Sequence, residues 1–78
     1  MTVAEAFGDL AEVLARMDPS KIVALRPSNG MVEKVEELVY KKKEGKITEE
    51  EAIELERYLA LDLLINLAKA RAKRILAA

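Results

Sequence analysis

The sequence predicts an all-α protein: an N-terminal helix and a short turn, followed by a helical hairpin whose second helix is long. Apolar residues recur at helical spacing in three separate segments, and Pro19, Pro27 and Gly45 lie between those segments. No proline or glycine follows Gly45, so the last segment has nothing to interrupt it. We expect a single small helical domain over residues 1–78.

The first helix is predicted over about residues 3–17. Thr2 and Glu5 stand at the spacing of a capping box, in which each side chain binds the backbone N–H of the other residue. Asp18 precedes Pro19 and is therefore disfavoured in helical backbone geometry, which ends the helix there. The apolar residues of this amphipathic helix alternate in steps of four and three: Val3, Phe7, Leu10, Leu14 and Met17.

A short turn is predicted over about residues 19–25 and a second main helix over about residues 29–44. Asp18 can cap the turn, and the sequence Pro27-Ser28-Asn29-Gly30 interrupts the chain again. Glycine at position 45 is a common terminator of helices. The apolar stripe of the second helix comprises Met31, Val35, Leu38 and Val39.

The last helix is predicted over about residues 49–77. Thr48 and Glu51 repeat the capping-box spacing, and the acids of the first turn complement the positive end of the helix dipole. Such a helix would be about 43 Å long, whereas a compact chain of this size is about 30 Å across. We therefore expect the last helix to extend beyond a compact monomer.

Two apolar faces run along the last helix. One comprises Leu61, Leu64, Ile65, Ala68, Ala72 and Ile75. The other comprises Leu59, Ala60, Leu63, Leu67 and Ala70. The first helices can cover one face of the last helix, but hardly both, and exposed apolar patches usually mark an interface. The sequence therefore predicts a homo-oligomer, as a dimer or a higher helical bundle, or a complex with another protein. The predicted residues of this association surface are Leu59, Leu63, Leu67, Ala70 and Arg71.

A narrow polar stripe separates the two apolar faces. Asp62, Asn66, Lys69 and Lys73 follow one another at steps of four, three and four. Asp62 and Asn66 have two interpretations. They form a solvated edge, or they fix the register of a helix–helix interface, as single polar residues do in coiled coils.

The residue inventory predicts a protein that is not an enzyme and has no catalytic, cofactor-binding or metal-ligating residues. The chain has no histidine and no cysteine, which removes the commonest general base and the commonest transition-metal ligands. Its glycines stand alone and form no phosphate-binding loop. The acidic cluster of residues 49–51 is what the start of a helix favours.

The charge balance argues against a global attraction to nucleic acid or anionic lipid, because 13 basic residues face 14 acidic ones. The basic residues at the end of the last helix complement the helix dipole. A weaker alternative is phosphate contact by Lys69, Lys73 and Arg74, which would give weak, sequence-independent nucleic-acid binding. The apolar run of residues 58–68 is too short for a membrane span. We expect no membrane association and a cytoplasmic location.

Residues 22–76 resemble a group of small prokaryotic helical proteins that share the pattern "EG.LT.EE..EL..Y..L..L...AKARA". The residues that carry the resemblance are Glu44-Gly45, Ile47-Thr48, Glu50-Glu51, Glu54-Leu55, Tyr58, Leu61, Leu64 and Ala68-Lys69-Ala70-Arg71-Ala72. Genes of this group often lie beside the gene of a predicted nuclease. The resemblance implies an antitoxin-like protein that binds and neutralises a partner nuclease.

Three functions remain as hypotheses. The first is a non-catalytic interaction module of antitoxin type, which lays its last helix into a groove of a nuclease. The second is a homo-oligomeric structural or scaffold protein, in which the same apolar face pairs with itself. The third is a nucleic-acid-associated protein that uses the basic residues near its C-terminus. The first two require the same apolar face, so the sequence leaves both open.

Overall fold

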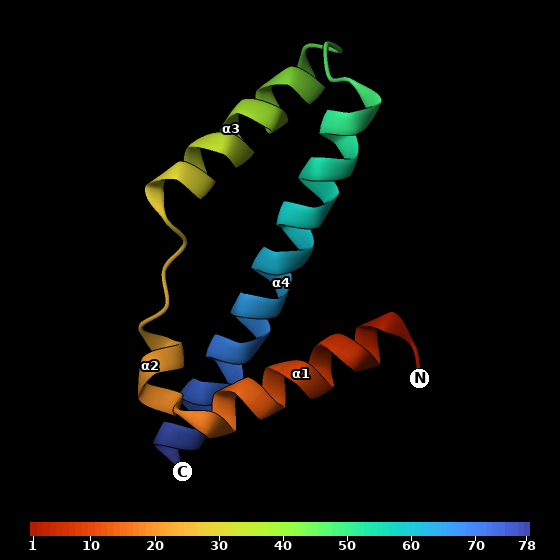
Figure 1. The fold of residues 1–78 in the computed structure, drawn as a ribbon. Helices are drawn as coiled ribbons and strands as arrows, with labels where there is room; N and C mark the ends of the chain where they lie inside the picture. The colour runs from red at the N-terminus through yellow and green to blue at the C-terminus, as the bar shows by residue number, and fades with distance from the viewer. The chain divides into compact units, whose positions relative to one another are not determined.

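The computed structural model describes all residues from Met1 to Ala78 and contains four helices and no strands (Figure 1). The all-α prediction is therefore confirmed, and the helices form where the sequence places them. They are α1 (Val3–Met17), α2 (Pro19–Val23), α3 (Asn29–Lys43) and α4 (Glu49–Ala77). None of them combines the length and the apolar character that a membrane span requires.

Local side-chain caps explain where the helices begin. The Thr2 hydroxyl accepts a hydrogen bond from the Glu5 backbone N–H at 3.1 Å, and Ser28 caps α3 in the same way. At α4 both halves of the predicted capping box are present. Thr48 Oγ1 accepts from the Glu51 N–H, and the Glu51 carboxylate accepts from the Thr48 N–H, each at 3.1 Å. These bonds satisfy backbone donors that a helix start leaves unpaired.

The turn between α3 and α4 depends on Gly45. Its φ of 69° lies in the left-handed region, where a side chain would clash with the backbone. Gly45 follows Glu44, the C-cap residue of α3, and thus ends that helix as the sequence predicts. The chain then reaches Thr48 and enters α4.

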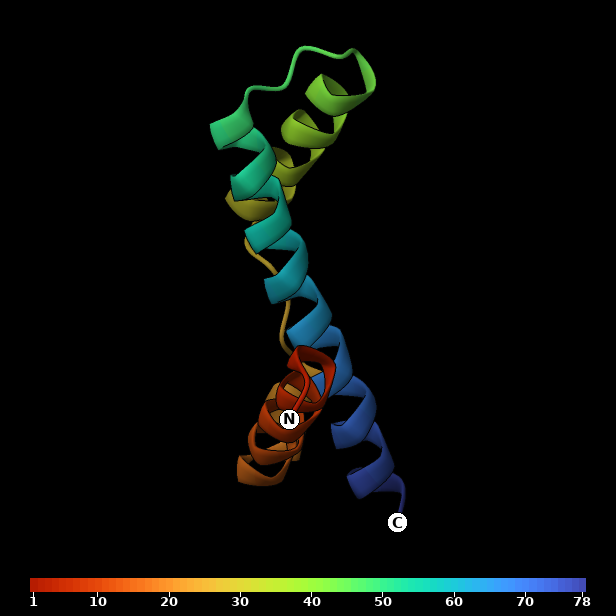
Figure 2. The same cartoon turned by 90° about the vertical axis from the view of Figure 1, so that its right-hand side faces the viewer.

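The chain divides into two compact units. One unit comprises residues 26–61, in which α3 and the first part of α4 form the predicted helical hairpin (Figure 2). Leu38 of α3 and Leu55 of α4 are its buried residues. Leu38 is completely buried and Leu55 is 4% exposed, so this hairpin has a small core of two leucines.

The other unit comprises residues 1–25 and 62–78, in which α1, α2 and the last part of α4 come together (Figure 1). Its completely buried residues are all alanines: Ala11 and Ala15 of α1, and Ala68 and Ala72 of α4. Alanine allows two helix backbones to approach closely, because it places only a methyl group between them. A cooperative single domain over residues 1–78 stays a prediction.

The apolar stripe of α1 is only partly buried. Of its five residues, Val3, Leu10 and Met17 are exposed, whereas Phe7 and Leu14 are half-buried. Ala11 and Ala15 are buried in their place. The inward side of α1 is thus rotated about 90° from the centre of the stripe, toward its smallest residues.

Candidate interaction surface

The association surface predicted on α4 is exposed in its larger residues. Leu59 and Leu63 are each 49% exposed, Leu67 is half-buried and Ala70 is exposed. In a continuous helix these positions follow one face, since successive members are three or four residues apart. The opposite face behaves differently, because Ala68 and Ala72 are completely buried within their unit. In the last part of α4, Ala68 and Ala72 are therefore covered, whereas Leu63 remains accessible.

Asp62 and Asn66 form a hydrogen bond along α4. Asn66 Nδ2 donates to Asp62 Oδ2 at 3.3 Å, and both residues are exposed. The pair satisfies part of its hydrogen-bonding capacity within one helix, as a solvated edge does. Its alternative role, the fixing of an interface register, stays a prediction.

Arg71 lies one turn beyond Leu67 on α4 and is engaged within the chain. Its guanidinium donates to Glu12 Oε2 of α1 at 3.1 Å, and this salt bridge joins the two helices. A Cβ atom added to Gly8 would lie 3.2 Å from Arg71 Nη2, so glycine at this position leaves room for the guanidinium. A part for Arg71 in partner binding stays a prediction.

Glu12 is held in its charged form by two arginines. The hydrogen bond from Arg71 lowers the pKa of the Glu12 carboxyl most, and Arg16 lowers it further. Arg16 lies one turn away on α1, with its Nε 2.9 Å from Glu12 Oε1. The Glu12 carboxylate thus accepts one hydrogen bond from Arg16 on its own helix and one from Arg71 on α4.

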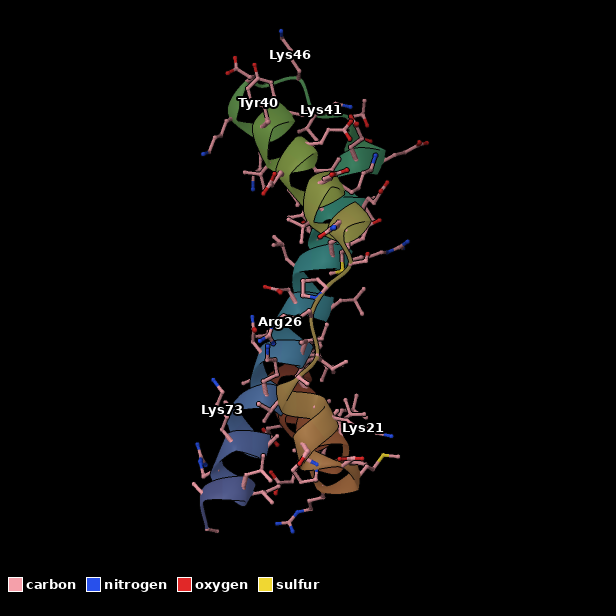
Figure 3. The ribbon with its side chains drawn as sticks, turned by 90° about the vertical axis from the view of Figure 1, so that its left-hand side faces the viewer. Lys21, Arg26, Tyr40, Lys41, Lys46 and Lys73 are labelled. Atoms are coloured by element: carbon pink, nitrogen blue, oxygen red, sulfur yellow. The ribbon has the colours of Figure 1, made fainter.

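The three basic residues proposed for phosphate contact have different surroundings, and their contact with phosphate stays a prediction. Lys69 Nζ donates to the backbone carbonyl of Leu25 at 2.9 Å, which ties α4 to the segment that follows α2. Lys73 projects outward from α4 (Figure 3). Arg74 lines a pocket of about 240 Å³. The other residues of that pocket are Glu12, Arg16, Arg71, Ile75 and Ala78.

A second ion-pair network lies at the turn of the helical hairpin, beside the positions of Tyr40 and Lys46 (Figure 3). The Lys41 ammonium donates to Glu51 of α4 and also contacts Glu37 of α3. The hydrogen bond from Lys41 is the main reason why the pKa of Glu51 falls to about 2, and the same bond raises the pKa of Lys41. This network joins α3 to α4 and has a structural role.

The structure also reveals an exposed apolar surface on α1, which the sequence pattern alone did not identify. Its largest exposed members are Val3, Leu10, Val13 and Met17. Spacing alone places these residues on one side of the helix, but does not tell whether that side faces the rest of the chain.

The Glu12–Arg71 pair was missed for another reason. The two residues are far apart in the sequence, and no local pattern connects them.

No family model, curated protein or solved structure matches this chain. The resemblance to antitoxin-like proteins therefore stays a prediction. The structure leaves apolar residues exposed on both α1 and α4.

Proposed function

We propose that the protein is a non-catalytic interaction module that binds a partner protein through the exposed face of α4. The supporting observation is that many large apolar residues lie on the surface and very few lie in the core. Thirteen of them are exposed by more than a third, whereas Leu38 is the only large side chain that is fully buried. Isolated exposed apolar residues are ordinary, but residues that follow one helix face form a contiguous surface.

The partner surface of this proposal lies on the last part of α4 and is centred on Leu63 and Leu67, with Ala70 at one end. A helix of this kind binds by laying its apolar residues into a groove, with anchors one turn apart. Leu63 supplies an anchor that is half exposed before binding. Asp62 and Asn66 border the surface and remain solvated beside it.

The resemblance to antitoxin-like proteins supports a nuclease as the partner. In this proposal the module occludes the nuclease and neutralises it without chemistry of its own. The alternative is a homo-oligomeric scaffold that uses the same face of α4. The observation in favour of this alternative is the same exposed surface, which can also pair with a second copy.

The test combines the purified protein with the product of the neighbouring gene and measures nuclease activity. We expect inhibition at one equivalent. The double variant Leu63→Glu, Leu67→Glu should weaken it at least about 100-fold, because it buries two charges in the contact. Lys42→Glu together with Lys43→Glu is the control, since these exposed residues lie on α3. Undiminished nuclease activity at excess protein, with no complex on a sizing column, would contradict the proposal.

A further inference from the structure

The exposed side of α1 carries four large apolar side chains. Val3 is 74% exposed, Leu10 54%, Val13 58% and Met17 75%. The completely buried residues of this helix are instead Ala11 and Ala15. α1 thus has two apolar sides, and the chain covers only the one with small residues.

The exposed residues follow the pattern of a coiled-coil seam. The exposed Val3, Leu10 and Met17 are seven residues apart, and the half-buried Ala6 and the exposed Val13 stand three residues after the first two. They occupy the a and d positions of two heptads, which is the pattern that pairs one helix with another. The seam is short, but α1 is already capped by Thr2 and joined to α4 by the Glu12–Arg71 pair. A helix that is already ordered loses little entropy when it pairs.

The charges that flank the seam identify the partner helix and its direction. Asp9 and Arg16 both occupy g positions, which face each other in an antiparallel pair of identical helices. Asp9 of each copy then lies opposite the partner subunit's Arg16, and two-fold symmetry forms this contact twice. A parallel pair would instead place Asp9 beside the e position, which Leu14 occupies.

We propose that the exposed side of α1 is the docking surface for α1 of a second copy of this chain, in antiparallel orientation. Asp9 is exposed and takes part in none of the salt bridges of the chain. Arg16 is 71% exposed beside Glu12 and remains accessible to a second carboxylate. In this seam Leu10 packs against the partner subunit's Val13. By symmetry, Val13 packs against the partner subunit's Leu10.

A lipid surface fits this helix less well than a second copy does. The polar side of α1 carries Glu5, Asp9 and Glu12 against the single basic residue Arg16. Helices that lie on anionic membranes have the reverse charge, with lysine and arginine on the polar side. The inference does not rest on the proposed function, because it uses α1 and leaves the face of α4 around Leu63 free.

The first test is the mass of the protein in solution, by sedimentation equilibrium from micromolar to millimolar concentration. We expect a reversible dimer of twice the 8.7 kDa chain mass. Leu10→Glu should weaken it at least about 100-fold, because the variant buries like charges at the seam. Leu63→Glu, at a similarly exposed position on α4, should leave it unchanged. A monomer throughout, or a dimer that only Leu63→Glu dissociates, would overturn the inference.

A charge exchange tests the flanking contacts. Asp9→Arg and Arg16→Asp should each weaken the dimer by about tenfold, since each places like charges opposite one another at two symmetric sites. The double variant should recover most of this loss, because it restores opposite charges across the seam. Circular dichroism checks that each variant keeps its helix content. Weakening by both single variants without recovery in the double variant would refute the pairing of Asp9 with Arg16.

Cysteine cross-linking tests the direction of the helices, and the chain has no native cysteine to interfere. In the antiparallel seam Ala6 lies opposite the partner subunit's Met17, whereas each of these residues lies about 16 Å from its own copy. A6C mixed with M17C should therefore form a disulfide-linked dimer, and neither variant should do so alone. A parallel seam gives the reverse result, and this would overturn the proposed orientation.

Discussion

Replacing Leu38 with alanine removes the only large side chain that the structure buries completely. The change removes three carbon atoms from the hairpin core, which corresponds to a transfer free energy of about 2.4 kcal/mol. A residual cavity adds to this, and leucine-to-alanine changes in cores range over about 2–5 kcal/mol. The hairpin core contains only one other buried residue, Leu55, so its walls can partly collapse. We expect a loss of about 2.5–3.5 kcal/mol, at the lower end of that range.

Leu61→Ala is the matched control, because it removes the same atoms from the same unit. Leu61 is 51% exposed, so the control should cost about 1 kcal/mol. Both variants gain the same small helix propensity from alanine, and their difference therefore reports burial. Urea unfolding, followed by far-ultraviolet circular dichroism, measures both losses. An equal loss for the two variants would refute the conclusion that Leu38 forms the hairpin core.

The same Leu38→Ala variant tests the prediction of a single domain. A small single core rarely provides more than about 3–5 kcal/mol of net stability, so the variant should be close to unfolding. If residues 1–78 unfold cooperatively, amide hydrogen exchange should accelerate at the buried positions Ala11 and Ala15 of α1 as well as in the hairpin. Faster exchange confined to residues 26–61 would show that the two compact units unfold separately.

Two further predictions concern the ion pair of the hairpin and the alanine contact of the other unit. Because its pKa is lowered from 4.5 to about 2, Glu51 contributes stability above pH 4.5 that is lost as pH falls toward 2. Glu51→Gln should reduce this acid dependence in urea midpoints measured across that range, and an unchanged pH profile would contradict the assignment. Ala72→Leu should destabilise the protein by about 1–3 kcal/mol through overpacking. Ala70→Leu, at an exposed position, should change stability by less than about 0.5 kcal/mol, and equal effects would refute the close helix contact.

The helix ends were predictable because they depend on short-range chemistry. Thr48 and Glu51 bind each other's backbone N–H across three residues, and Gly45 adopts the positive φ that ends α3. Each signal is complete within a few neighbouring residues. The exposure of Leu59 and Leu63 was predictable too, because a long helix with two apolar faces has too few neighbours in a short chain.

The rotation of α1 was not predictable, because apolar periodicity gives the most weight to large side chains. The burial of Ala11 and Ala15 depends on how closely α1 approaches its neighbours, which a one-dimensional pattern does not contain. The salt bridge between Glu12 and Arg71 was unpredictable for the same reason. It depends on which turn of α1 lies beside α4.

Alanine packing and surface exposure on α1 are two consequences of one arrangement. A contact between methyl groups brings helices close together but removes little apolar area from water, so it stabilises the unit only modestly. It also turns Val3, Leu10, Val13 and Met17 outward. These side chains contribute no hydrophobic stabilisation until another surface covers them. Any partner that covers this side binds the folded helix in preference to the unfolded chain, and so stabilises the fold by mass action. If α1 binds a second copy or α4 binds a different protein, that association would stabilise a chain whose own core is small.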